Sequence, residues 1–299
     1  MKKIFLFAAA AMVSLSSCVQ TNEVYTGGVQ EIGFKSAVTR AVIEGTTFDG
    51  DIAVSSVWNN PADAADFVSY FDNTTFALNS EGVWAATPAK YWPSSGDMQF
   101  LALHPAISAT AAYNADGTFK TLTTGLIENA TAQDDVLFSD LLEVEAPQTS
   151  AQSLLFHHAL AQLNINIKKV ETSAVVKVNS IAVNGVGLEG VLTVTAASTS
   201  TAAWSSVATG DHLFVDTETE LTTTDTNPTA LLVMPSAQTE IVIEYTIDGK
   251  AQTYTHTLTG TWDMGYKYTY NYTINVNEIL FDCTVDEWED FVPSSSTTI

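Results

Sequence analysis

The sequence predicts an all-β protein built from two β-sandwich domains in tandem. Apolar and polar residues alternate with a period of two in almost every apolar stretch, which puts the apolar side chains on one face of a sheet. Thr, Val, Tyr and Ile fill these stretches, Gly, Pro, Asn and Asp separate them, and no convincing helical stripe occurs. One sandwich takes about 100 to 150 residues, so a chain of 299 residues has room for two.

The chain begins with the features of a bacterial secretory signal peptide at residues 1–17. Lys2 and Lys3 precede an apolar run that is too short to span a bilayer and that ends in small residues. The next residue completes the pattern LSSC of a lipobox, in which the cysteine becomes acylated. We therefore expect Cys18 to carry acyl chains such as palmitate; the alternative is an ordinary signal peptide followed by a chance cysteine.

A tether and a first strand follow. Residues 18–30 are polar and contain glycine, as expected of a link between a lipid anchor and a folded body. Residues 31–38 alternate, with Ile32, Phe34 and Val38 on the inward side, and burial of each side chain stabilises the fold by about 1.5 to 3 kcal/mol. We interpret this segment as an edge strand of the first sandwich.

The rest of the chain supplies the remaining strands of the two sandwiches. Strands are expected at 52–57, 66–71, 98–103, 136–144, 163–167, 175–183, 188–195, 230–234, 240–247, 252–258, 265–276 and 279–286. Asp248 and Gly249 separate two alternating runs, which predicts a tight hairpin. The polar, proline-containing segment 143–152 interrupts the apolar runs, so we place the first domain at 31–148 and the second at 149–299.

The charge and cysteine content of the chain exclude some partners and bonds. Asp and Glu total 34 against 11 Lys and Arg, giving a formal net charge of -23, and such a surface repels the phosphates of nucleic acid. Once Cys18 is acylated, Cys283 is the only thiol left, so we expect no intrachain disulfide.

No group of residues predicts catalysis, a metal site or a cofactor. Asp134 and Asp135 are adjacent, so an extended chain points them to opposite faces, and we expect both in a solvated loop. His157 and His158 have the same geometry, and we expect them to be structural. Nucleophile-elbow, phosphate-loop and Cys-x-x-Cys motifs do not occur in the sequence. We therefore predict that the protein is not an enzyme.

Four tyrosines lie on one face of the expected strand 265–276. They are Tyr266, Tyr268, Tyr270 and Tyr272. Aromatic rows stack on sugar rings, so a monomeric glycan-binding lipoprotein of the cell surface is the alternative function. The simpler interpretation is that the tyrosines pack in the core of the second sandwich.

Short segments spread over most of the chain resemble one protein family. In order, they are LSSC, IGFKSAVTRA, YWPSSGDMQFLALHP, LLFHHALAQLNINI, LLVMPS, GTWDMGYKYTYNYTINVNEILF and VDEWED. In their joint order and spacing they resemble the fimbrillin family, the FimA-like and Mfa-like lipoprotein subunits of Bacteroidetes pili.

The resemblance implies two transthyretin-like sandwich domains and a structural role in a surface fimbria that serves adhesion. Its implied partners are other fimbrial subunits and a host or bacterial surface receptor. Members of the family reach the outer membrane as lipid-anchored precursors, and an arginine-specific protease cuts them beside a TRA-like sequence. Loss of the N-terminal strand then opens a groove, which a C-terminal strand of a neighbouring subunit fills.

Arg40 is the only arginine in the chain, and it stands in the sequence TRA. The resemblance implies a cut between Arg40 and Ala41, which would make residues 31–40 a removable strand. The alternative is that Arg40 is an ordinary loop residue of an unprocessed lipoprotein.

The C-terminal tail departs from the family pattern. After Trp288 it is short and poor in apolar residues, and Pro293 would interrupt its backbone pairing, so it makes a weak donor strand. A donor strand that begins near Ile279, or a tip or accessory subunit that accepts a strand without giving one, fits the sequence as well. An anchor subunit that keeps its lipid also remains open.

Overall fold

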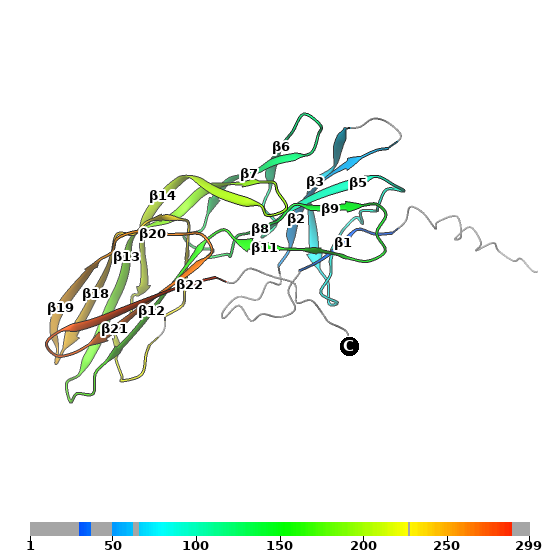
Figure 1. Cartoon of the computed structure of the whole chain (residues 1–299). Helices are drawn as coiled ribbons and strands as arrows, with labels where there is room; N and C mark the ends of the chain where they lie inside the picture. The colour runs from blue at the N-terminus through cyan, green and yellow to red at the C-terminus, as the bar shows by residue number, and fades with distance from the viewer. Residues whose placement is uncertain (1–29, 37–49, 62–65, 227, 289–299) are drawn as a thin grey trace, which may run out of the picture.

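The structure is a computed structural model that describes residues 30–36, 50–61, 66–226 and 228–288. Every regular element in these ranges is a β-strand, which confirms the predicted all-β class. The molecule is elongated, with the sheet of the first half at one end and a sandwich of two sheets at the other (Figure 1). Several sequence predictions lie outside the described residues: the signal peptide, Cys18, the tether up to residue 29, Val38, the Arg40–Ala41 bond and the tail after Trp288.

The first half of the chain forms a nine-stranded sheet. Its strands pair in the order β10-β1-β4-β3-β2-β5-β8-β11, and β9 pairs with β5. Only Leu155 separates β10 from β11 in the chain, yet they lie at opposite ends of this order, so the sheet curls until its ends nearly meet. The strands are β1 (Gly33–Ser36), β2 (Ile52–Asn59), β3 (Phe67–Leu78), β4 (Trp84–Ala86), β5 (Asp97–His104), β8 (Leu137–Ser139), β9 (Leu142–Glu145), β10 (Gln152–Leu154) and β11 (Phe156–His158).

The central strands of this sheet bury side chains on both faces. In β5, Met98 and Phe100 face an inner core that is rich in aromatic residues, whereas Leu101 and Leu103 face a different core, to which both halves of the chain contribute. A strand that is buried on one face alternates apolar and polar residues, but a strand that is buried on both faces does not need to. This explains why β5 is apolar along nearly its whole length, with only Gln99 as a polar interruption.

The 20-residue strand β13 connects the two halves of the molecule. β14 pairs along one side of β13, while β18 pairs with its first part and β7 with its second part on the other side. The strands of this sheet are β6 (Ala109–Tyr113), β7 (Phe119–Glu128), β13 (Val176–Thr195), β14 (Thr201–Val215), β15 (Thr219–Glu220), β18 (Glu240–Ile247) and β19 (Lys250–Thr257). Because β6 and β7 come from the first half of the chain, both halves contribute to one sheet.

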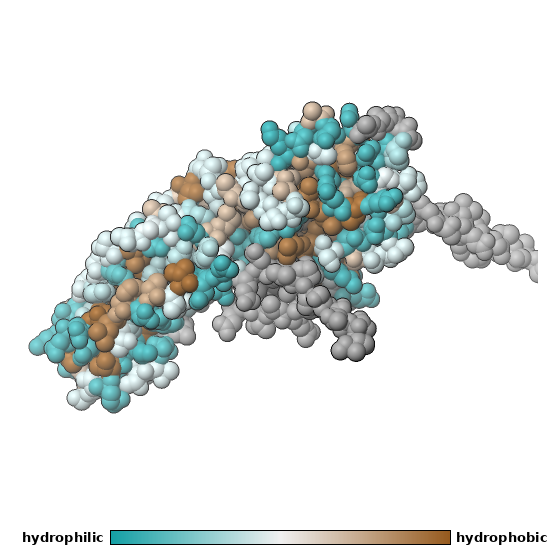
Figure 2. Space-filling view, in the orientation of Figure 1, coloured by the Kyte–Doolittle hydropathy of each residue, from teal (hydrophilic) through white to brown (hydrophobic). Residues whose placement is uncertain are grey.

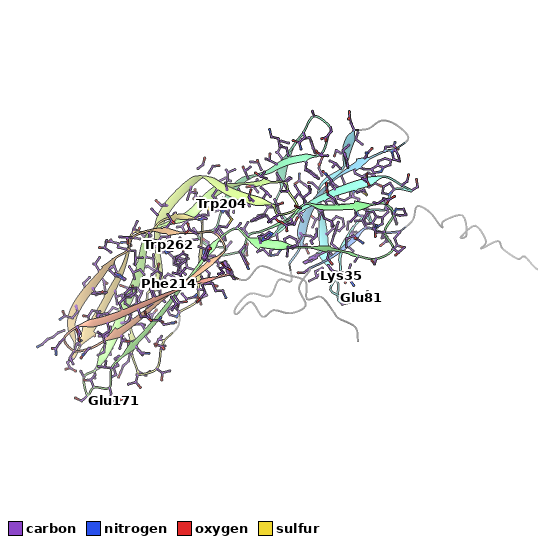
Figure 3. The ribbon with its side chains drawn as sticks, viewed as in Figure 1. Lys35, Glu81, Glu171, Trp204, Phe214 and Trp262 are labelled. Carbon is purple, nitrogen blue, oxygen red and sulfur yellow. The ribbon has the colours of Figure 1, made fainter. Side chains whose placement is uncertain are left out.

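The second half closes as a sandwich around its own core. A four-stranded sheet in the order β16-β12-β21-β22 packs on the sheet that contains β13, and the short pair β17–β20 lies beside them. These strands are β12 (Ala161–Lys169), β16 (Leu231–Val233), β17 (Ser236–Ala237), β20 (Thr261–Trp262), β21 (Tyr266–Ile274) and β22 (Ile279–Glu287). Trp262, labelled in Figure 3, is fully buried here, and its Nε1 donates to the Tyr270 hydroxyl at 2.9 Å.

The tyrosine row of β21 belongs to this core. Tyr268, Tyr270 and Tyr272 are buried, and only Tyr266, at the start of the strand, is partly exposed. The simpler interpretation of the row is therefore correct, and these rings are not available to stack on a glycan.

A third core joins the two halves. Its buried members come from both, among them Leu103 of β5, Leu122 of β7, Leu192 of β13, Met234 and Trp288. Trp204 of β14, labelled near the middle of the molecule in Figure 3, packs against it, and its Nε1 donates to the carbonyl of Ala159 at 2.6 Å. The domain boundary between residues 148 and 149 stays a prediction. Two strands that follow this boundary in the chain pair with strands that precede it, β10 with β1 and β11 with β8.

The predicted hairpin between β18 and β19 is present. Asp248 and Gly249 have φ angles of 48° and 75°, as a two-residue turn with both central residues in the left-handed region requires. All eight residues of β18 pair with β19, from Glu240 opposite Thr257 to Ile247 opposite Lys250.

His256 of β19 predicts a dependence of stability on pH. Burial lowers the pKa of its imidazole below 6.5 and raises the pKa of the Tyr272 phenol, whose oxygen lies 2.9 Å from Nδ1. The folded state thus favours the neutral imidazole, so its stabilising contribution is present above about pH 6.5 and is lost as the pH falls through the lowered folded pKa. We expect the midpoint of thermal unfolding to fall between about pH 7 and pH 5, and to fall less in His256→Gln.

Burial also lowers the pKa of His212, so a His212→Gln variant gives an independent comparison. An unchanged pH profile in the His256→Gln variant would contradict the assignment. Circular dichroism melts of both variants beside the parent chain measure it.

Candidate assembly site

Strand β1 lies inside the first sheet, between β4 and β10. Phe34 pairs with Trp84 of β4 in an antiparallel ladder and with Gln152 of β10 in a parallel one. Just before the strand, the backbone N–H of Ile32 donates to the carbonyl of Lys90 at 2.7 Å. Both flanks of the segment are therefore hydrogen-bonded to the body.

The position of β1 corrects the expectation of an edge strand. The sequence pattern shows which side chains point inward but not which strands pair alongside, and β10 adds to the outer side of β1. A strand between two partners leaves a gap with unpaired backbone groups on both flanks when it is removed, whereas an edge strand leaves only one such row.

Phe34 anchors β1 in the inner core. Its side chain is fully buried, and its ring meets those of Phe76 and Phe100 edge to face, each with 5.2 Å between ring centroids. Ile32 is 2% exposed and belongs to the same core. We call the space that β1 fills, between β4 and β10 and floored by Phe76 and Phe100, the β1 groove.

The intervening residues fit the same position. Gly33 lies so close to Val83, the residue before β4, that a Cβ atom at position 33 would stand 3.1 Å from its Cγ1. Lys35 is exposed and faces away from the core (Figure 3). Ile32 and Phe34 are buried and Lys35 is exposed, as an alternation with a period of two predicts. Val38, Arg40 and Ala41 lie beyond the described part of this segment.

The two adjacent histidines form a separate cluster at the junction of the halves. His157 lies 2.9 Å from a carboxylate oxygen of Asp140, and Nδ1 of His158 lies 2.9 Å from a carboxylate oxygen of Asp135. The imidazole of His158 stacks on the Trp288 indole, with 3.6 Å between ring centroids. Asp135, expected in a solvated loop, is buried, because the loop folds back against β11.

This cluster supports a structural role for the histidines, as expected. Sequence reasoning missed the pairs because Asp135, His158 and Trp288 are far apart in the chain, and no spacing rule connects them. Within the described ranges, no group of three or more His, Cys, Asp or Glu side chains is placed to hold a metal ion. In the same ranges, no helix has the length and apolar character needed to span a membrane.

The described residues define an all-β protein in which an N-terminal strand fills a groove in the first sheet. The chain belongs to the fimbrillin-like family, whose model matches residues 39–288. β1 lies outside the matched span. No curated protein sequence matches the chain.

Solved structures from Bacteroides species share the fold. A candidate cell adhesion protein of Bacteroides uniformis has a TM-score of 0.55 and 18% identity, and the match covers 87% of this chain and 99% of the other. A fimbrial protein of Bacteroides vulgatus has a TM-score of 0.54 and 16% identity, with 87% and 100% covered. At these identities the likeness establishes the fold.

Proposed function

We propose that this protein is a structural subunit of a cell-surface fimbria, assembled by strand exchange after proteolysis and serving adhesion. Family membership supports a fimbrial role, and the β1 groove is the observation that carries the mechanism. A short segment near the N-terminus supplies a buried anchor, Phe34, and fills the space between β4 and β10. The role is structural and needs no catalysis.

Cleavage between Arg40 and Ala41 is the proposed trigger. The cut would separate β1 from the rest of the body, so that only noncovalent contacts hold the strand. Its release would expose apolar side chains of the inner core together with unpaired backbone groups of β4 and β10. Such a groove favours a strand from another subunit, because only a strand satisfies both the backbone groups and the apolar floor.

The precursor is proposed to reach the outer membrane through lipid on Cys18. A tether of residues 18–30 lets the body stand away from the bilayer, where an arginine-specific surface protease meets it. The assembled form is then found in the fimbrium, with other subunits as partners.

The donor strand of this chain is proposed to lie beyond Trp288 unless β22 detaches. All nine residues of β22 pair with β21, from Ile279 opposite Ile274 to Glu287 opposite Tyr266, and Trp288 is buried in the junction core. A donor that begins at Ile279 would have to break all of these contacts first. This favours a subunit that accepts a strand more readily than it gives one.

Blocking the cut tests the proposal. Arg40→Ala should abolish polymers while the precursor stays folded, because β1 remains covalently attached. Arg40→Lys keeps the positive charge and should behave like Arg40→Ala under an arginine-specific protease, whereas Lys35→Ala should polymerise normally. Electron microscopy, SDS-resistant ladders and N-terminal sequencing report the outcome. Ladders that persist in Arg40→Ala, or assembled subunits that begin at Cys18, would refute the model.

A further inference from the structure

A hollow lies at the far end of the second sandwich, where its two sheets diverge. It has a volume of about 620 Å³ and is lined by residues of β18, β19 and the turn that joins β21 to β22. In Figure 1 this is the end of the molecule farthest from β1, where the chain turns from β18 into β19 and from β21 into β22. Figure 2 shows hydrophobic and hydrophilic surface side by side over this tip.

The pairing of β18 with β19 shows why a hollow forms here. Antiparallel partners share a face, so Tyr254 lies on the same face as its partner Ile243, which is buried in the core. Two and four residues before Tyr254 along β19, the same inward face carries Gln252 and Lys250. A core would need apolar residues at these positions. The inward face of β19 therefore changes from core to polar surface before the sandwich ends.

The opposite side of the hollow is also polar. The turn after β21 contributes Asn277 and Glu278, both exposed, and Tyr245 of β18 adds a second half-buried phenol ring. Among the described residues, no side-chain hydrogen bond or ion pair involves Gln252, Lys250 or Asn277. Two aromatic rings, two side-chain amides and charged groups thus line one space, and Gln252, Lys250 and Asn277 make no side-chain bond to another described residue there.

We propose that this hollow binds a neutral oligosaccharide. Sugar rings present an apolar face and a rim of hydroxyls, so they combine stacking on Tyr254 and Tyr245 with hydrogen bonds to planar amides such as that of Gln252. The volume is within the range of about 300 to 1,000 Å³ that is typical of ligand sites. Local charge disfavours acidic sugars, because Asp248 and Glu278 outnumber Lys250 in the lining. This site is distinct from the tyrosine row of β21.

A printed panel of short glucose-, galactose- and mannose-terminated oligosaccharides, with sialylated counterparts, tests the proposal on the full chain without its signal peptide. We expect binding to neutral members and weaker binding to their sialylated forms. Tyr254→Ala should lower the affinity about tenfold or more, because a stacking platform is lost. Gln252→Ala should also weaken binding, and Gln252 is exposed, so this variant keeps its fold.

Tyr113→Ala is the matched control, since Tyr113 is an exposed tyrosine in β6 of the first half. It should bind like the parent chain. The proposal would be overturned if the parent chain bound no member of the panel, or if it preferred sialylated sugars. It would also be overturned if Gln252→Ala and Tyr254→Ala both bound as tightly as the parent chain. Capture of extended peptides in place of sugars would assign this end to strand addition along β19 and overturn it as well. None of these outcomes depends on polymerisation, so the proposed fimbrial assembly is tested separately.

Discussion

Phe34→Ala is expected to lower the free energy of unfolding of the precursor by about 3 to 5 kcal/mol, the range for truncating a buried phenylalanine. The side chain is fully buried and makes edge-to-face contacts with Phe76 and Phe100. Its loss leaves a cavity in a core that cannot collapse easily, because the surrounding strands are held by their own ladders. Urea denaturation of the uncleaved chain measures the change.

Lys35→Ala is the matched control from the same strand. Lys35 is exposed, so its truncation should change the stability by no more than about 0.5 kcal/mol. If Phe34→Ala also stayed within that margin, β1 would contribute little to the precursor, and the β1 groove would lose its energetic basis.

A disulfide between β1 and β10 is expected to block polymerisation even after cleavage at Arg40. Lys35 pairs with Ser153 in the parallel ladder, and both are exposed. Neighbouring strands lie about 4.8 Å apart, within the range of Cα separations that a disulfide spans. The double variant Lys35→Cys with Ser153→Cys should therefore hold β1 in its groove under oxidising conditions and release it on reduction.

This experiment separates strand release from proteolysis. The oxidised double variant should show the normal cut by N-terminal sequencing and yet form no ladders, and dithiothreitol should restore them. Each single cysteine variant should polymerise under both conditions. Ladders from the oxidised, cleaved double variant would mean that assembly does not require the groove to empty.

Local features of the fold were predictable from the sequence. The all-β class follows from alternation, the Asp248–Gly249 hairpin follows from turn chemistry, and the burial of Ile32 and Phe34 follows from the period of the first strand. Each of these depends on neighbouring residues, and a sequence displays neighbours directly.

Features that depend on distant pairing were not predictable. Nothing in residues 119–128 indicates that β7 joins β13, and nothing near β1 indicates that β10 covers its outer side. The same holds for the cluster of Asp135, His158 and Trp288. The polar inward face of β19 could have been noticed as a break in the alternation of apolar residues, but only the register identifies which face points inward.

The continuity of β13 has a mechanical consequence. β13 is flanked by β18 in the second half and by β7 from the first, so its backbone runs unbroken from one half into the other. A pull along the long axis would load the rows of lateral hydrogen bonds that join β13 to β18 and β7 in shear. A filament built from such units would transmit tension through neighbouring strands that bear the load together.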